Sequence, residues 1–468
     1  MSEINIGAPL RRELGLFSST IVVVANMIGT GIFTTPGLIA SELQNPYSVL
    51  ICWVIGGLFA LCGAFSYGEL GAIFPEAGGE YVYLREQFGR LMGFLSGWVS
   101  LLVGFSAPIA AASIAFSAYL FQTLGMLEGP LIIFAPYGIH LMTLSLPIAV
   151  SIAAIILVSG IHYLGVIFGS KVQNALTIFK LCVIIIFILS AFLIGRGSTT
   201  NFSGEWRLWD LFNGKFAVSL IFVSFAYSGW NAAAYLGGEI KKPEITLPFA
   251  LVLGTIIVVT LYLLLNIVFI YSLPQQALSQ VIEVGSKSAI ALFGESISIY
   301  FSACISLALL SVLSAMIMTG PRVYYAMARD NLFFRLFGKV DSAHGTPAHS
   351  IFLQGGIAVA MVLTASFDRL LIYIGFTLSI FTSLAVIGLV RTRLKLPSVS
   401  PGYRTFGYPV TPILFILGNS WIIYFSIVTR PLASLWGFLT IGLGILVFLF
   451  FECKNRGLKT GPRQKFSR

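Results

Sequence analysis

Long runs of apolar residues, each about as long as a membrane-spanning helix, alternate with short polar links along the 468-residue chain. A helix needs about 20 mostly apolar residues to cross the hydrocarbon core of a bilayer. Twelve segments meet this requirement, namely residues 16–40, 47–71, 91–122, 144–161, 169–195, 216–238, 247–273, 297–320, 348–365, 369–391, 411–429 and 433–452. The pattern therefore predicts an all-α integral membrane protein with twelve transmembrane helices.

Small and polar residues interrupt two of these spans. The first span contains Ile28-Gly29-Thr30-Gly31-Ile32 at its middle, and the sixth contains Phe225-Ala226-Tyr227-Ser228-Gly229-Trp230-Asn231. Glycine weakens a helix by about 1 kcal/mol relative to alanine. Backbone that unwinds at bilayer depth is tolerated only where it is buried in protein or lines a cavity. Each interruption is therefore predicted to be a helix break at a binding site.

The two interruptions occupy corresponding positions in two halves of the chain. Gly31 and Gly229 are 198 residues apart, which is a separation of five spans, so the second half enters the membrane from the opposite side. This is the pattern of an inverted repeat whose site lies between two discontinuous helices. The expected organisation is an N-terminal segment 1–15, a first repeat 16–195, a second repeat 216–391, two further spans 411–452 and a basic tail 453–468.

The backbone at the two breaks suits a zwitterionic ligand. Free N–H groups at the start of a half-helix attract a carboxylate, unwound carbonyl groups attract an ammonium, and an α-amino acid carries both on one carbon. The alternative is that the glycines only allow close helix packing, but two breaks in matching positions favour a site. The candidate substrate-binding residues are Ile28, Gly29, Thr30, Gly31, Ile32, Phe225, Ala226, Tyr227, Ser228, Gly229 and Asn231.

Lys180 stands near the middle of the fifth span, far from both of its ends. A charged side chain at the bilayer centre costs about 3 kcal/mol on insertion scales, so this lysine is expected to face the protein interior. Its distance from both interfaces argues against a side chain that extends to the membrane surface. Lys180 is therefore predicted to hold the unwound backbone of the first span as a fixed cation, or to carry a proton.

Composition and charge agree with a membrane protein and indicate its orientation. Hydrophobic residues make up 57% of the chain and charged residues 10%, whereas a soluble domain is about 25% charged. With the N-terminus inside, twenty-one of the 28 Lys and Arg residues lie on the cytoplasmic side, so both termini are expected in the cytoplasm. The net charge of +10 does not indicate nucleic-acid binding, because the basic residues flank apolar spans.

The remaining polar residues suggest no enzyme, metal site or cofactor. The five cysteines (Cys52, Cys62, Cys182, Cys304 and Cys453) are interpreted as small core hydrophobes, and no metal-binding spacing is present. Glu69 and Glu239 are expected on solvated span ends, and the alternative is that each pairs with basic residues as a latch. The four histidines lie near span ends or in links, which gives a histidine proton relay little support. No acidic residue lies mid-membrane, which favours a neutral over a cationic substrate.

Several motifs in this order resemble the L-type amino acid transporter branch of the amino acid–polyamine–organocation superfamily, over nearly the whole chain. They are Ile28-Gly29-Thr30-Gly31-Ile32-Phe33 with Pro36-Gly37, Pro75-Glu76-Ala77-Gly78-Gly79-Glu80-Tyr81, Lys171-Val172-Gln173-Asn174 with Lys180, Phe225 to Asn231, and Arg322-Val323-Tyr324-Tyr325-Ala326-Met327-Ala328-Arg329-Asp330. The resemblance implies the leucine-transporter fold, a 5+5 inverted repeat with two extra helices, and sodium-independent amino acid transport by alternating access.

The resemblance also implies roles for individual residues. Gly29, Thr30, Gly31, Phe225, Ser228 and Gly229 match positions that bind the substrate's carboxylate and amine, and Phe225 matches the gating aromatic. Lys180 matches a lysine whose ammonium replaces a bound sodium between spans 1 and 8, with Ser311 or Ser314 as its neighbour. Tyr262 matches a tyrosine that exposes or closes that region.

Two departures from the family pattern bear on specificity and partners. Ser228 stands where animal members have glycine, so the resemblance does not predict which amino acid is transported. The loop between spans 3 and 4 has no cysteine, so no disulfide-linked heavy chain is expected. The sequence thus predicts a stand-alone bacterial inner-membrane carrier for neutral L-amino acids, working by exchange or proton-coupled uptake in the lipid bilayer. The alternatives are a cationic amino acid or polyamine antiporter, a channel and, least supported, a membrane-embedded enzyme.

Overall fold

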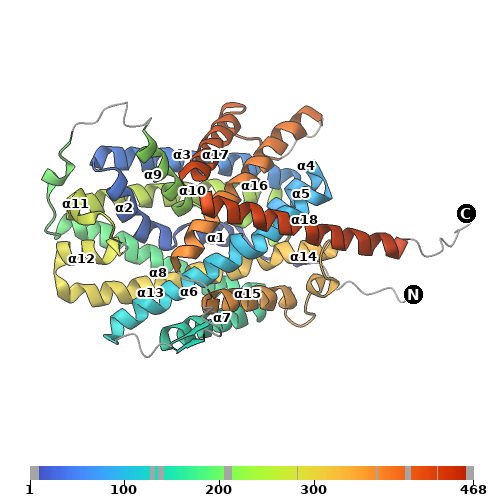
Figure 1. Cartoon of the computed structure of the whole chain (residues 1–468), viewed down its shortest axis with the longest axis horizontal. Helices are drawn as coiled ribbons and strands as arrows, with labels where there is room; N and C mark the ends of the chain where they lie inside the picture. The colour runs from blue at the N-terminus through green and yellow to red at the C-terminus, as the bar shows by residue number, and fades with distance from the viewer. Residues whose placement is uncertain are drawn as a thin grey trace, which may run out of the picture.

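The computed structural model describes residues 10–126, 132–134, 142–204, 213–281, 283–364, 367–395, 402–429 and 431–459. Helices make up nearly all of it, and many of the long ones run along the longest axis of the molecule (Figure 1). One antiparallel hairpin, β1 (Ile132–Phe134) with β2 (Met142–Leu144), lies between two of the helices. Residues 1–9 of the predicted N-terminal segment and 460–468 of the predicted tail lie outside the described residues.

The first half of the chain forms eight α-helices and one π-helical segment within the described residues. They are α1 (Leu16–Met27), α2 (Thr30–Glu42), α3 (Pro46–Ile73), α4 (Glu80–Phe88), α5 (Arg90–Val99), η1 (Ser100–Ser106), α6 (Ala107–Leu124), α7 (Leu146–Tyr163) and α8 (Val166–Leu193). Local sequence explains several starts. Asn45 accepts hydrogen bonds from the backbone N–H groups of Tyr47 and Ser48, and Pro46 occupies the first turn of α3.

The second half begins with shorter pieces and ends with long helices. They are η3 (Thr199–Phe202), α9 (Gly214–Ala226), η5 (Ala232–Tyr235), η6 (Gly237–Glu239), α10 (Pro243–Ser272), α11 (Gln275–Leu278), α12 (Val284–Phe293), α13 (Glu295–Thr319), α14 (Pro321–Arg329), η7 (Arg335–Gly338), α15 (Ala348–Thr364), α16 (Phe367–Lys395), α17 (Val410–Thr429) and α18 (Pro431–Lys459). Helices distant in sequence pack together, as α3 does with α10 and α6 with α13.

Ten helical stretches in the described part of the chain are long and apolar enough to cross a membrane. The protein is therefore a multi-pass membrane protein, but the predicted number of twelve spans is not confirmed. Predicted span 216–238 is only half α-helical, since α9 ends at Ala226 and short 3₁₀ turns follow. Predicted span 348–365 corresponds to α15, which is a shorter apolar helix.

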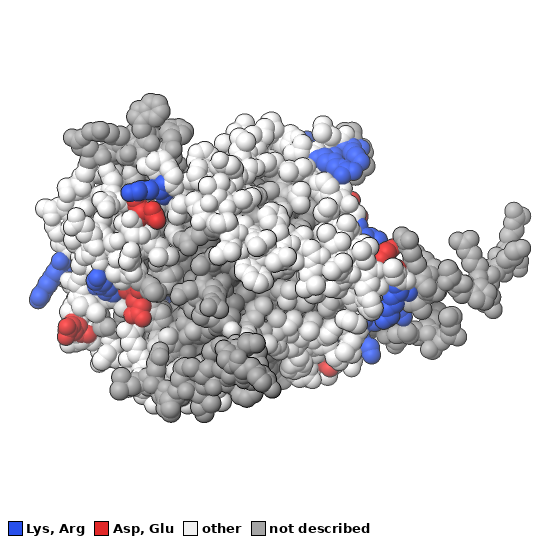
Figure 2. Space-filling model, viewed as in Figure 1, with Lys and Arg blue, Asp and Glu red and all other residues white. Residues whose placement is uncertain are grey.

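The surface has the charge distribution of a protein that sits in a bilayer. Figure 2 shows Lys, Arg, Asp and Glu side chains near the two ends of the longest axis and a broad uncharged belt between them. Large apolar side chains are exposed on the outer helices; Leu157 is 64% exposed, Ile186 62% and Trp436 63%. Such a surface would be unfavourable in water and is suited to lipid.

Two ion pairs with buried carboxylates lie at the end of the molecule that holds α4 and α14 (Figure 1). Glu239 accepts hydrogen bonds of 2.9 and 3.0 Å from Arg322, and both side chains are at most 1% exposed. Glu69 accepts a hydrogen bond of 2.8 Å from Arg393 Nε and one of 2.6 Å from the backbone N–H of Thr405. The expectation of solvated span ends is thus wrong, and the alternative of pairing with basic residues is confirmed, because helices distant in sequence cover both carboxylates and supply the arginines.

The cysteines are all free in the structure, but their surroundings differ. Cys52 and Cys62 are buried in α3, as expected for small core residues. Cys182 and Cys453 are exposed and Cys304 is partly exposed, so the interpretation as core hydrophobes is wrong for these three. The reason is helix geometry, since a 3.6-residue period turns part of every apolar span toward the outside of the bundle.

Candidate functional site

The first break is shorter than the sequence predicts. α1 ends at Met27 and α2 begins at Thr30, so only Ile28 and Gly29 are unwound, both with extended or intermediate backbone angles. Thr30, Gly31 and Ile32 form the first turn of α2 instead. No side chain caps this helix start. The N–H groups of that first turn are therefore available to a ligand, at the positive end of the helix dipole.

The second break follows α9 and lies directly against the first. Gly229 has a φ of +96°, a left-handed conformation that glycine adopts most easily. A Cβ atom on Gly229 would come within 3.0 Å of the backbone of Asn26, and one on Gly31 within 2.7 Å of Ala226 Cα. The two interruptions thus approach so closely that only glycine fits at both contacts. The continuation is not an α-helix but the 3₁₀ turns η5 and η6.

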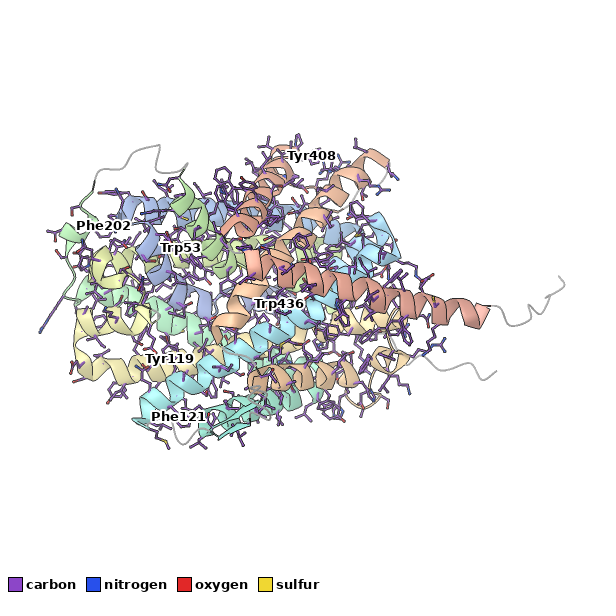
Figure 3. All side chains as sticks on the ribbon, in the orientation of Figure 1. Trp53, Tyr119, Phe121, Phe202, Tyr408 and Trp436 are labelled. Atoms are coloured by element: carbon purple, nitrogen blue, oxygen red, sulfur yellow. The ribbon has the colours of Figure 1, made fainter. Side chains whose placement is uncertain are left out.

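Tyr262 of α10 joins the two breaks. Its hydroxyl lies 2.6 Å from the carbonyl oxygen of Met27 and 3.1 Å from that of Ala226. A hydroxyl has one hydrogen to donate, so the two carbonyls compete for it. The rings of Trp53, Tyr227 and Tyr262 pack together with centroids 5.1 to 5.5 Å apart. Figure 3 shows Trp53 inside the bundle, where α3 packs against α9 and α10.

Lys180 of α8 faces the interior, as the sequence predicts, and is 1% exposed. Its Nζ donates hydrogen bonds to the carbonyl oxygens of Ile28 at 2.6 Å and Ala25 at 3.2 Å. The ammonium therefore contacts the unwound segment from the side of α8. Both acceptors lie at the C-terminal end of α1, where the helix dipole is negative and favours a cation.

The serines expected beside Lys180 make other contacts or none. Ser314 lies 2.7 Å from Nε2 of His162, a side chain that is buried in the last turn of α7. Ser311 is buried, and its hydroxyl has no hydrogen-bond partner among the described residues. Nothing near His162 in the sequence singles it out, because it lies near a span end and its partner is 152 residues away.

A cavity of about 140 Å³ lies where the two breaks meet. A single water needs about 10 to 15 Å³ by this measure, so there is room for a small ligand. Among the predicted substrate-binding residues, the cavity is lined by Gly29, Thr30, Gly31, Phe225, Ala226, Tyr227, Ser228, Gly229 and Asn231. Ile28 and Ile32 are instead packed in the core, where they are 1% and 0% exposed.

The cavity has walls that sequence reasoning missed. Glu80, the first residue of α4, lines it and accepts a hydrogen bond of 2.5 Å from Nδ2 of Asn231. α4 lies outside the apolar spans, which is why the search for an acidic residue within a span did not find Glu80. The sequence signal is the Pro75 to Tyr81 motif, which contains Glu80 and whose Gly78-Gly79 pair, with positive φ angles of 119° and 52°, makes the turn into α4. Further polar positions come from Ser379 and Thr382 of α16 and Asn419 of α17.

Comparisons with known proteins agree with this architecture. The sequence model of the family described as "Amino acid permease" matches residues 14–451. The chain is 28% identical to the b(0,+)-type amino acid transporter 1 of Homo sapiens, covering 98% of this chain and 91% of that protein. It is also 28% identical to the serine/threonine exchanger SteT of Bacillus subtilis (strain 168), over 94% and 95%. The cystine/glutamate transporter of Homo sapiens is 26% identical, over 94% and 85%.

Proposed function

The chain belongs to the amino acid permease family, and on this premise we propose that it is a sodium-independent secondary transporter of neutral L-amino acids. It works by alternating access, either as an exchanger or with proton-coupled uptake. The observation that carries the proposal is the meeting of two helix breaks at one cavity, with an uncapped helix start facing it. The similar proteins named above are amino acid transporters and exchangers by description.

The α-carboxylate and α-ammonium groups of the substrate are recognised by main-chain groups at the two helix breaks. Its carboxylate accepts hydrogen bonds from the first-turn N–H groups of α2, at Thr30 and Gly31, where the helix dipole adds to the attraction. Its ammonium donates to unwound carbonyl groups of the second break, between Tyr227 and Trp230. This division uses groups that every α-amino acid presents, so the side chain is left to decide specificity.

The walls around the breaks favour a neutral side chain. Phe59, Phe225 and Ile422 give the cavity apolar surface, and Phe225 is placed to cover the bound substrate as a gating aromatic. A cationic amino acid or polyamine is the second candidate, and Glu80 is the observation that favours it. Its carboxylate already accepts a hydrogen bond from Asn231, and it is 2% exposed, so the neutral substrate remains the proposal.

Lys180 accounts for sodium independence. Its ammonium lies among backbone carbonyl oxygens at the end of α1, which is the kind of site that coordinates sodium at a broken helix. A covalently attached cation makes a soluble one unnecessary there. Tyr262 contacts the same end of α1 through Met27 and links it to Ala226 in the second break.

The proposal extends to the setting of the protein. The distribution of Lys and Arg along the sequence supports an inner-membrane protein with both termini in the cytoplasm. In that orientation the end holding α4, α14 and the Glu239–Arg322 pair is cytoplasmic. The division into inverted repeats 16–195 and 216–391, with spans 11 and 12 outside them, belongs to the same proposal, as does function without a disulfide-linked heavy chain.

Counterflow into proteoliposomes tests this function. Purified protein, with protein-free vesicles as control, is assayed with each of the twenty radiolabelled L-amino acids at two pH values, in sodium and in choline medium. We expect saturable counterflow of neutral amino acids that is equal in the two media. If lysine or arginine gives the largest counterflow, the cationic alternative is correct. If the flux does not saturate with substrate concentration, the protein is a channel. A steep sodium dependence would contradict the role given to Lys180.

A further inference from the structure

Glu80 is a buried acidic residue in the wall of the cavity that no part of the transport scheme above uses. Its side chain is 2% exposed. Asn231 Nδ2 donates to its carboxylate at 2.5 Å and lies 3.2 Å from the hydroxyl of Tyr235. Asn231 follows the second break directly, and both Asn231 and Tyr235 line the same cavity. The carboxyl is therefore tied to the segment that the proposed mechanism requires to move.

The groups around this carboxyl are uncharged hydrogen-bond donors. Tyr67 of α3, Tyr83 of α4 itself and Tyr235 of η5 are the titratable side chains that face it. Within the described residues no ion pair includes Glu80. Arg85 pairs with Asp330, Arg322 with Glu239 and Arg393 with Glu69, so these three arginines already have carboxylate partners.

A buried carboxylate without a cation is costly, and it lowers that cost by taking up a proton. Burial raises the pKa of the Glu80 carboxyl to about 7, although the neighbouring polar side chains of Tyr67, Asn231 and Tyr235 oppose the shift. α4 lies between the apolar spans formed by α3 and by α5 to α6, on the side of the cavity near the buried ion pairs. Both protonation states are therefore accessible near neutral pH.

We propose that Glu80 is a proton-binding site of the transport cavity and that Asn231 transmits its protonation state to the second helix break. The inference rests on the proposed function, since it takes this cavity to be the transport cavity. The step is a simple proton transfer in which one carboxylate oxygen takes a proton from water or hydronium and later returns it. No electron transfer or second reactant is involved.

The geometry favours a proton over a cationic substrate group as the ligand of Glu80. One carboxylate oxygen already has a donor at 2.5 Å, and the side chain is almost fully buried. An ammonium or guanidinium group would need additional space beside the carboxylate and would have to displace Asn231 from it, whereas a proton requires neither. Hydrogen bonds to an ionised acceptor are about twice as strong as those between neutral groups. Protonation therefore weakens the hold on Asn231 and eases movement of the second break.

The test is the pH dependence of counterflow with tritiated L-serine and, in parallel, tritiated L-arginine, at equal pH on both sides from about pH 5 to about pH 9. Wild-type exchange is expected to rise as the pH falls, with a midpoint near 7. Glu80→Gln, which is fixed in a neutral form, is expected to lose this inflection. Glu86→Gln is the matched control, because Glu86 is on the same helix and 43% exposed; it should keep the wild-type midpoint.

A second variant keeps the test decisive if Glu80→Gln does not fold. Tyr235→Phe removes a hydroxyl whose hydrogen bond lowers the pKa of Glu80, so the midpoint of the transport profile should move to higher pH. An unchanged midpoint in Tyr235→Phe, or a retained inflection in folded Glu80→Gln, overturns the proposal.

A readout without substrate separates this proposal from the transport function. Infrared difference spectra of the detergent-solubilised protein should show a protonated-carboxyl carbonyl band that titrates near neutral pH, remains in Glu86→Gln and disappears in Glu80→Gln. Absence of that band in wild type overturns the proton site. If the band titrates as expected while neither amino acid is exchanged, the proton site stands and the proposed function has failed.

Discussion

Replacing Gly31 with valine is expected to abolish substrate binding and transport. A Cβ atom at this position would lie 2.7 Å from the Cα and 3.1 Å from the Cβ of Ala226. The first of these atoms is backbone, so it cannot rotate away as a flexible side chain could. Inserting methyl groups into a packed site typically costs about 1 to 3 kcal/mol. Here the strain acts on the contact between the two breaks, so it separates the halves of the proposed site.

The measurement is radiolabelled counterflow, normalised to the amount of monodisperse protein. Gly356→Ala in α15 is the control, because its added Cβ has no neighbour within 4 Å. Gly29→Ala provides a graded comparison within the same break. Gly29 has an extended φ of −120°, and its Cβ would be at ordinary contact distance, 3.6 Å, from a side-chain atom of Val312. A smaller loss is therefore expected. Wild-type affinity in Gly31→Val would remove the first break from the site.

Lys180→Ala is expected to reduce turnover by about tenfold to a hundredfold while the protein still folds. The change leaves the carbonyl oxygens of Ala25 and Ile28 without their donor. A buried acceptor without a partner costs about 1 to 3 kcal/mol, and each 1.4 kcal/mol in a barrier is about a tenfold change in rate. The substitution destabilises the conformation in which Lys180 of α8 binds the unwound segment, and transport must pass through this conformation.

The matched control is Lys171→Ala, which removes an exposed lysine from the same helix. It is expected to transport at the wild-type rate. Initial exchange rates of both variants, compared with their size-exclusion profiles, separate a loss of turnover from a loss of folded protein. A wild-type rate in Lys180→Ala would show that the buried ammonium is a bystander.

Local sequence was sufficient to predict the breaks and the buried lysine. Gly29 and Gly31 in an apolar run, and Lys180 in another, conflict with an uninterrupted lipid-facing helix, and each conflict is visible within a few residues. The family resemblance, which was inferred from short motifs of this kind, is confirmed by the family match over residues 14–451. What a short window could not supply was the exact extent of the break, because the first turn of α2 is stabilised by its packing on α9.

Contacts between distant segments account for what was missed. Glu80 and Asn231 are 151 residues apart, His162 and Ser314 152, and Glu69 and Arg393 324. Nothing near any of these residues in the sequence predicts its partner. The second half of span 6 was missed for a related reason. Its small residues are compatible with an α-helix, yet the segment Ala232 to Glu239 forms 3₁₀ turns where it packs against neighbouring helices.

The position of a bound amino acid tests most directly whether the two breaks form the substrate site. The measurement is a cryo-electron microscopy structure of the protein with the neutral amino acid that gives the largest counterflow. We expect the ligand carboxylate within hydrogen-bond distance of the N–H groups of Thr30 and Gly31, and its ammonium against the backbone of Tyr227 to Trp230. A ligand seated elsewhere, or one whose carboxylate points away from the start of α2, would contradict the proposed site.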